Sequence, residues 1–134
     1  MSITSLRISG SGLTAERTRL DTISQNIANA QTTRGADGRA YRRRAVIFEA
    51  IPPGQPDAGG VRATEVVESN APLERVYNPS HPDADAEGYV EMPNVNPVEE
   101  MVDLLAATRA YEANVVAVNA TKTLVARALE LGHV

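Results

Sequence analysis

The sequence predicts an α+β protein that is mainly α, with a long helix at each end of the chain. The two helices are expected to pack as a coiled-coil-like pair, and a small β-hairpin-containing middle region separates them. Three observations predict this fold. Apolar residues recur at heptad spacing near both ends, and β-branched residues gather around a Pro/Gly-rich loop in the middle. One Phe, four Tyr and no Trp among 134 residues also favour helix packing over a β-sandwich.

The N-terminal stripe predicts a helix over about residues 3 to 30. Its apolar residues are Leu6, Leu13, Leu20 and Ile27, seven apart, with Ile23 and Ala30 three residues after the last two. Gly10 and Gly12 each weaken this helix by up to ~1 kcal/mol relative to Ala. Asn29 and the polar stretch that follows it are expected to end the helix.

The middle of the chain predicts short strands. Residues 41–51 and 61–68 are rich in β-branched or aromatic side chains and flank a loop of prolines and glycines, which indicates a hairpin. Residues 73–77 and 88–92 are candidates for two further short strands. The remaining prolines predict an extended, turn-rich connection to the second helix.

The C-terminal helix has a well-marked start. Asn96 and Pro97 are typical of an N-cap and a first helical position, while Glu99 and Glu100 place negative charge in the first turn. Gly132 predicts the C-cap after a run of about 35 residues. The helix carries heptad stripes at Met101, Thr108, Val115, Lys122 and Leu129 and at Leu104, Tyr111, Val118 and Val125.

Both stripes are longer than the middle region can cover, so they need a partner. Packing between subunits is the favoured interpretation, and a two-helix hairpin buried within one chain is the alternative. Charge and composition exclude several other classes. A net charge of −4 argues against a nucleic-acid binder, no cysteine is available for disulfides or thiolate sites, and no apolar run approaches a membrane span. The first twenty residues do not resemble a secretory signal.

Three local motifs have structural rather than chemical explanations. Asp83, Asp85, Glu87 and Gly88 have the spacing that opens a calcium loop, but Asn94 stands where the bidentate carboxylate belongs, so a solvated acidic turn is favoured over a calcium-responsive module. Ser80, His81 and Asp83 lie too close along the chain to form a triad, so we expect no enzyme activity and no cofactor. The basic cluster is expected to serve a subunit contact or edge protection and consists of Arg39, Arg42, Arg43 and Arg44 with Tyr41.

The N-terminal segment 11–33, with Asn26-Ile27-Ala28-Asn29 at its centre, resembles the signature of bacterial flagellar axial proteins. Further matches over residues 77–85, 87–96, 98–103, 109–114 and 119–122 narrow the resemblance to the flagellar basal-body rod protein family, closest to its proximal rod members. The resemblance covers nearly the whole chain.

The resemblance implies a structural subunit that polymerises helically through its terminal helices into the periplasmic rod, the drive shaft of flagellar motility. Residues 1–33 and 95–134 would form the axial assembly core and residues 34–94 the middle region. The implied partners are other copies of the chain, other rod proteins, inner-membrane ring and rod-base proteins, and the type III export apparatus, which exports without a cleaved signal. The alternative is a monomeric helical-hairpin adaptor that binds a partner helix.

Stripe residues and motif residues together form the expected subunit interface. They are Leu6, Leu13, Leu20, Ile23, Asn26, Ile27, Asn29, Met101, Leu104, Tyr111, Asn114, Val115, Val118, Val125 and Leu129.

Overall fold

The computed structural model describes residues 2–132, so Met1 and the last two residues of the expected region 95–134 lie outside the described residues. The elements along the chain are α1 (Ser2–Ala28), β1 (Arg44–Ala50), β2 (Val61–Glu68), β3 (Glu74–Tyr77), β4 (Tyr89–Met92) and α2 (Pro97–Leu131). This order confirms the predicted fold class. Neither helix of the described chain has the length and apolar character needed to cross a membrane.

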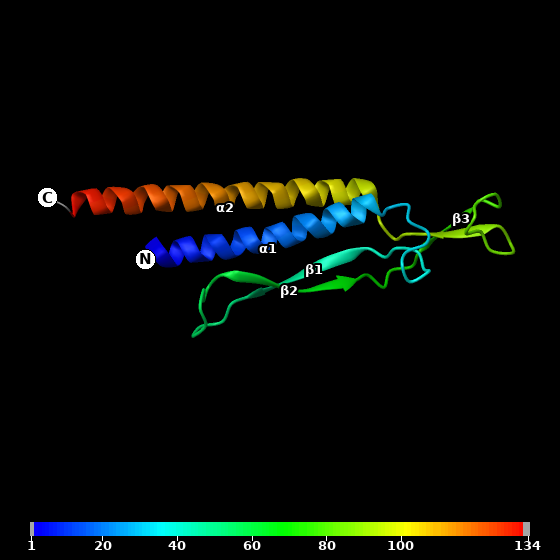
Figure 1. The fold of residues 1–134 in the computed structure, drawn as a ribbon, viewed down its shortest axis with the longest axis horizontal. Coiled ribbons are helices and arrows are strands. Elements are labelled where there is room, and N and C mark those ends of the chain that lie inside the picture. Colours follow the sequence, from blue (N-terminus) through cyan, green and yellow to red (C-terminus); the bar gives the residue numbers. More distant parts are fainter. Residues whose placement is uncertain (1, 133–134) are drawn as a thin grey trace.

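The two helices lie side by side and run antiparallel (Figure 1). Asn26 near the end of α1 contacts Glu100 near the start of α2, and Gly12 of α1 lies against Asn114 of α2. Both ends of the chain therefore lie at the same end of the molecule, and α2 extends past the start of α1 (Figure 1). The structure thus contains the intramolecular helix pair that the sequence left as an alternative.

The N-terminal helix ends at Ala28, two residues before the predicted end. Asn29 follows it, and its side-chain amide donates a hydrogen bond to the carbonyl of Gln25 at 2.9 Å. The same carbonyl also accepts the backbone N–H of Asn29 at 3.0 Å, so Asn29 closes the last turn with both its side chain and its backbone.

Both predicted caps of α2 are confirmed. The Asn96 side-chain oxygen accepts hydrogen bonds from the backbone N–H groups of Val98 and Glu99 at 3.1 and 3.4 Å. Pro97 occupies the first turn, where its missing N–H is not needed. At the other end the Gly132 N–H donates to the Ala128 carbonyl at 3.1 Å, with the glycine in right-handed rather than left-handed conformation.

Replacing Asn96 by Ala should lower the free energy of unfolding by about 1 kcal/mol, because the cap's acceptor is lost. Thermal and urea unfolding followed by circular dichroism measure this change. Asn96→Asp keeps an acceptor oxygen at the same place and serves as the matched control. Equal stability of Asn96→Ala and the parent chain would show that the cap does not support the helix.

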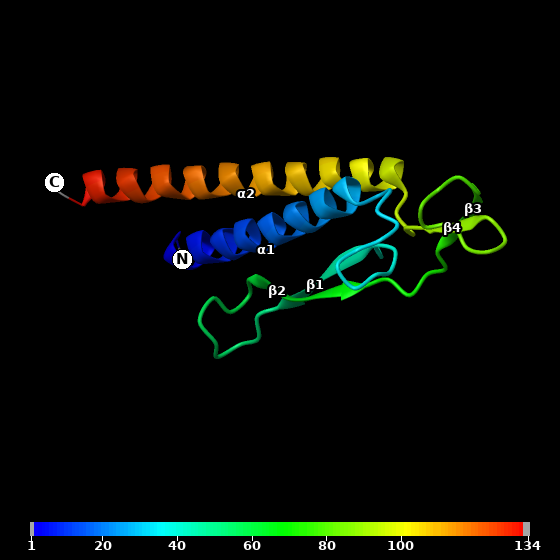
Figure 2. The same cartoon turned by 45° about the vertical axis from the view of Figure 1, so that its right-hand side comes forward.

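Strands β1 and β2 form the predicted antiparallel hairpin, and β3 and β4 form a second, shorter one (Figure 2). In the first hairpin Arg44 pairs with Glu68 and Ala50 with Val61, and the register shifts between Ile47 and Phe48. In the second, the rings of Tyr77 and Tyr89 meet edge to face with centroids 5.4 Å apart. The second hairpin lies beyond the start of α2, away from both chain ends (Figure 2).

Helix α1 lies between α2 and the first hairpin (Figure 1). It contacts α2 on one side and both β1 and β2 on the other. The fully buried apolar core is small in the described chain, with Ala15, Ile23, Val90 and Ala107 as its members. The outward face of α2 has no layer over it, and this open face bears directly on function.

Two glycine positions allow the layers to approach closely. A Cβ atom on Gly12 would lie 2.9 Å from the Asn114 side-chain nitrogen, and one on Gly60 would lie 2.4 Å from the Ser11 hydroxyl. The Ser11 hydroxyl also accepts a hydrogen bond from the Val61 N–H at 3.0 Å. The segment of α1 that glycine weakens is therefore one where both neighbouring layers approach closely.

Gly12→Val should lower the free energy of unfolding by about 1–3 kcal/mol, because the added side chain overlaps Asn114. Gly10→Val is the matched control, since no atom lies within 4 Å of a Cβ there. Adding Asn114→Ala to Gly12→Val should recover part of the loss in urea unfolding. Equal effects of the two valine variants would contradict the close approach at Gly12.

Candidate functional site

A cluster of polar groups, two of them buried, joins α1, the start of β1 with the segment before it, and α2, and we name Asn26, Tyr41, Arg43 and Glu100 the polar junction. Asn26 is 0% exposed. Its side-chain oxygen accepts hydrogen bonds from the Tyr41 hydroxyl at 2.7 Å and the Arg44 N–H at 2.9 Å. Its nitrogen donates to the Arg44 carbonyl at 2.8 Å and to Glu100 Oε2 at 3.2 Å. The amide therefore uses all four of its hydrogen-bonding positions.

Glu100 brings a buried charge to the junction. It is 1% exposed, although it sits in the first turn of α2. Its second oxygen, Oε1, pairs with the Arg43 guanidinium, which also reaches Asp103 Oδ2 at 3.4 Å. The carboxylate thus has a cation, an amide and the positive end of the helix dipole around it. These contacts place Asn26 of α1 opposite Glu100 of α2.

The junction continues into the connecting segments. The Arg43 N–H donates to Asn94 Oδ1 at 2.7 Å, and the Asn94 amide donates to the carbonyls of Ser69 and Ala71 at 3.3 and 3.0 Å. Burial raises the pKa of the Tyr41 hydroxyl, which stays a proton donor to Asn26 at neutral pH. These hydrogen bonds therefore join the end of α1, the start of α2 and the open end of the first hairpin at one place.

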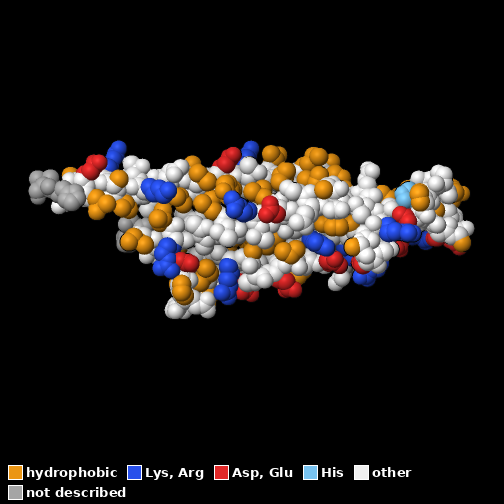
Figure 3. Space-filling model, viewed as in Figure 1, with side chains coloured by type: hydrophobic (Ala, Val, Ile, Leu, Met, Phe, Trp, Pro, Cys, Tyr) orange, Lys and Arg blue, Asp and Glu red, His pale blue; other side chains and the backbone are white. Residues whose placement is uncertain are grey.

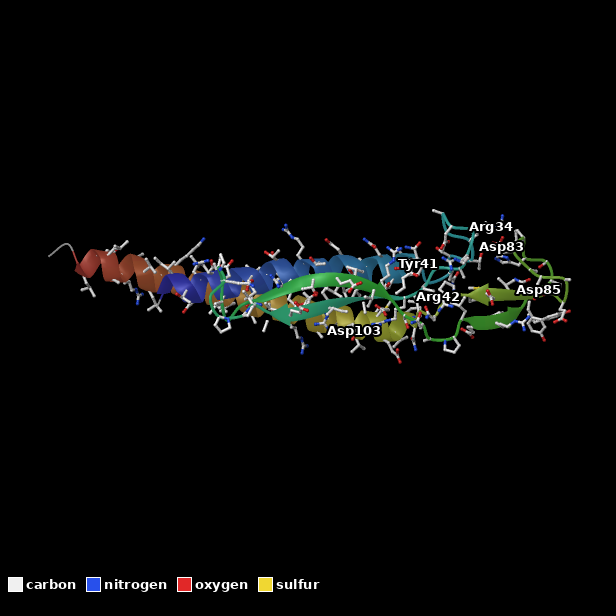
Figure 4. The ribbon with its side chains drawn as sticks, turned by 90° about the horizontal axis from the view of Figure 1, so that it is seen from below. Arg34, Tyr41, Arg42, Asp83, Asp85 and Asp103 are labelled. Atoms are coloured by element: carbon white, nitrogen blue, oxygen red, sulfur yellow. The ribbon has the colours of Figure 1, made fainter. Side chains whose placement is uncertain are left out.

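The acidic turn is stabilised by the chain itself. Asp83 Oδ2 accepts a hydrogen bond from the Thr33 hydroxyl at 2.7 Å, and Asp83 Oδ1 pairs with Arg34 at 2.9 Å. Figure 4 shows the Arg34 and Asp83 side chains facing each other. The Thr33 hydrogen bond and the Arg34 charge hold the pKa of Asp83 below its usual value. The Asp83 carboxylate therefore connects the loop after α1 to the loop after β3.

The Asp85 carboxylate is likewise bound by groups of its own chain. One oxygen accepts hydrogen bonds from the Tyr89 and Glu87 N–H groups at 2.9 Å each, and the other pairs with Arg75 at 3.0 Å. The backbone hydrogen bond from Tyr89 contributes most to lowering the pKa of Asp85. Within residues 2–132 no group of three or more acidic or histidine side chains is placed to hold a metal ion.

The basic cluster has acceptors within the chain. Arg39 pairs with Asp37, Arg43 with Glu100, and Arg44 with Glu68. Arg42 donates to the carbonyls of Ser69 and Ala71 and lies at the base of the hairpin (Figure 4). These arginines therefore serve contacts within the chain, and they do not form one continuous basic surface.

The expected interface residues divide by exposure. Ile23 and Asn26 are buried and Met101 and Leu129 are exposed. The partly buried ones are Leu6, Leu13, Leu20, Ile27, Asn29, Leu104, Tyr111, Asn114, Val115, Val118 and Val125. Leu104, Tyr111 and Val118 lie three or four residues from the buried Glu100 and Ala107 or from Asn114, so they share the face of α2 that meets α1.

Sequence reasoning missed a different face of α2. Val98, Val102, Leu105 and Val116 are more than half exposed there, although none of them belongs to the heptad stripes. Their spacing of three, four and seven residues at the start of the helix was a signal that could have revealed this second stripe. It was obscured because the inward stripe follows the same spacing.

Comparisons with known proteins match the chain to bacterial flagellar rod proteins. A family model described as "Flagella basal body rod protein" matches residues 6–36, and one described as "Flagellar basal body rod FlgEFG protein C-terminal" matches residues 86–131. The chain is 44% identical to the flagellar basal-body rod protein FlgC of Bacillus subtilis (strain 168), with 96% of each chain covered. It is 45% identical to FlgC of Salmonella typhimurium (strain LT2) over 94% of each chain, and 39% identical to FlgC of Aquifex aeolicus over 93% of this chain and 92% of the relative.

Proposed function

The chain belongs to the FlgC family of flagellar basal-body rod proteins, and from this premise we propose that it polymerises helically through its terminal helices to build the proximal rod. The family is one of structural subunits of the flagellar basal body. In the proposed role each copy contributes α1 and α2 to the wall of the rod. The rod then transmits rotation, and the chain acts as a structural element without catalysis or cofactor.

One observation carries this proposal: α2 exposes a large amount of apolar surface that its own chain does not cover. Eight large apolar side chains of α2 are more than half exposed, and they are Val98, Met101, Val102, Leu105, Val116, Leu124, Leu129 and Leu131. Large contiguous apolar patches on a soluble chain mark interaction sites. Fully burying an exposed side chain of this kind gains about 1.5–3 kcal/mol, so covering the remaining exposed part of these side chains would add stabilisation on assembly.

The expected interface residues fit this proposal in two ways. Those that face α1 hold the helix pair in a fixed register and so present one outer surface to neighbours. Met101 and Leu129 remain exposed and available to another subunit. In this proposal residues 1–33 and 95–134 act as the assembly core, and residues 34–94 support it.

The proposed setting follows from the same role. A proximal rod lies in the periplasm, so its neighbours are other rod proteins, the inner-membrane ring and the proteins of the rod base. In this proposal the chain reaches its position through the flagellar export apparatus.

Deletion and complementation test the proposal. A strain without the chain should lack complete basal bodies and motility, and the parent sequence should restore both. Basal bodies isolated from the complemented strain should contain the chain in several copies, measured by quantitative mass spectrometry. A chain found only as a soluble monomer, with basal bodies intact without it, would favour the helical-hairpin adaptor and overturn the proposal.

A further inference from the structure

An open pocket of about 300 Å³ lies where α1, α2 and the first hairpin meet, and it shares no residue with the polar junction. Gly59 and Gly60, from the loop between β1 and β2, line part of it. Figure 3 shows charged side chains of both signs beside apolar ones where this loop lies below the start of α1. The apolar wall of the pocket consists of Ile8, Phe48, Ala50 and Val61. The volume is at the lower end of the range for ligand pockets, which suits a single long side chain.

The carboxylate of Glu16 lines this pocket and has few partners for its degree of burial. The Glu16 side chain is 13% exposed, and its oxygen Oε2 is buried without a hydrogen-bond donor among residues 2–132. The nearby Arg19 guanidinium places its Nη1 3.7 Å from Oε2, which is too far for a hydrogen bond. Buried polar atoms are nearly always hydrogen-bonded. The carboxylate therefore keeps acceptor capacity that its own chain does not use.

The other polar side chains of the pocket add acceptors as well. The Asn114 side-chain nitrogen donates to the Ala110 carbonyl at 3.0 Å, and its amide oxygen remains an acceptor. Glu49 brings a second carboxylate, whose ion pair with Arg62 is 3.9 Å long and about half exposed on both sides. Over the described part of the chain, no Lys, Arg or His lines the pocket. Apolar walls are thus combined with acceptors and negative charge.

These features select a long basic side chain as the occupant. Lysine and arginine have an apolar stem and a charged end that donates several hydrogen bonds. The stem would lie against Phe48 and Val61, while the charged end would meet the Glu16 carboxylate. A metal ion fits less well, because it needs more ligands, and residues 2–132 place no group of three or more acidic or histidine side chains together.

We infer that this pocket binds a lysine or arginine side chain of another protein. The inference goes beyond the proposed function, because it concerns a different partner and the hairpin side of α1 instead of the open face of α2. The chain carries a net charge of −4. At long range this charge attracts a basic protein and repels further copies of the same chain, so electrostatics favours the basic partner.

Model side chains added to the purified chain test the chemistry of the pocket. N-acetyl-arginine amide and N-acetyl-citrulline amide have nearly the same shape, but only the first carries a charge. An NMR titration at low salt follows the amide signals of Gly60 and Asn114. We expect saturable shifts with the arginine probe and at least about tenfold weaker binding of the citrulline probe, because hydrogen bonds between charged groups are the stronger class. Equal binding of the two probes would overturn the inference.

Glu16→Gln separates a binding role from a structural one. It should abolish binding of the arginine probe and leave the urea midpoint of unfolding no lower than that of the parent chain, because a poorly satisfied buried charge is removed. Asp21→Asn is the matched control, since it removes one negative charge at an exposed position of the same helix and should keep the binding. A lower urea midpoint for Glu16→Gln would show that Glu16 serves the fold through Arg19 and would overturn the inference.

Photo-cross-linking in cells tests the source of the side chain. The deletion strain produces a chain in which Glu49, at the pocket, is replaced by p-benzoylphenylalanine. Mass spectrometry should identify a cross-linked peptide that contains Lys or Arg and comes from another protein, and adding Glu16→Gln should remove it. Cross-links only to copies of the chain, cross-links that survive Glu16→Gln, or none at all would overturn the inference, while restored motility in the same strain would leave the proposed function standing.

Discussion

Arg43→Met should lower the free energy of unfolding by about 2–3 kcal/mol, less than the ~3–5 kcal/mol typical of a fully buried ion pair, because the Arg43 side chain is 34% exposed while Glu100 is 1% exposed. Glu100 is 1% exposed and would keep only the Asn26 amide as a close partner. Methionine fills much of the arginine's volume, so the change removes the charge and its hydrogen bonds with little loss of packing. Urea unfolding of the purified chain, followed by circular dichroism, measures the difference.

The adjacent residue supplies a matched control. Arg44 pairs with Glu68 at 3.8 Å, and both side chains are substantially exposed. Exposed pairs contribute little, so Arg44→Met should change stability by less than about 1 kcal/mol. Arg43→Met combined with Glu100→Gln should recover most of the loss, because the buried charge is then removed as well. Equal losses for Arg43→Met and Arg44→Met would contradict the polar junction as described.

Features specified by neighbouring residues were predictable from the sequence. The start of α2 follows from Asn96 and Pro97, whose effects act within one turn, and the structure confirms both. The first hairpin likewise follows from two β-branched runs and the loop between them. The cap acts within one turn, and the hairpin pairs two strands that are consecutive in the chain, from Ala50 with Val61 to Arg44 with Glu68, so both features are local in sequence.

The polar junction was not predictable in the same way. Its members come from positions 26, 41, 43 and 100, and no local pattern states that Glu100 meets Asn26. In the sequence Glu100 looks like a first-turn acid that favours the helix dipole, and that interpretation gave no reason to expect its burial. The polar Asn26 among the apolar residues of α1 indicated that its side chain makes a polar contact, but the sequence did not identify the residue that it contacts.

The layering of the molecule also depends on nonlocal contacts. Gly12 reads in sequence as a weak point of α1, yet the structure places it where Asn114 approaches most closely. Heptad spacing alone does not tell whether a stripe meets a helix of its own chain or of another. The structure assigns the inward stripe of α2 to α1 and leaves a second, outward stripe exposed.

A carboxylate at Ile23 should abolish cooperative folding of the chain. Ile23 is buried and lines an open pocket with Val46 and Phe48 of β1, so Ile23→Asp would put a carboxylate where isoleucine packs between α1 and the hairpin, although Arg19, Arg43 and Arg44 line the same pocket. Such burial costs several kcal/mol, a large share of the ~5–15 kcal/mol by which native domains are stable. Thermal unfolding should therefore lose its sigmoidal transition, and the chain should be degraded in cells.

Ser24→Asp is the matched control for Ile23→Asp, because Ser24 is exposed on the same turn of α1. It should change the free energy of unfolding by no more than about 0.5 kcal/mol and leave motility intact. Ile23 lies inside the chain and the exposed apolar side chains of α2 lie outside it, so changes at the two places should act at different stages. Loss of Ile23 should remove the folded subunit before export or assembly, whereas polar changes at Val102 or Leu105 should leave a folded subunit that fails to join its neighbours. An Ile23→Asp chain that unfolds cooperatively and still builds rods would show that α1 does not form the central layer of the subunit.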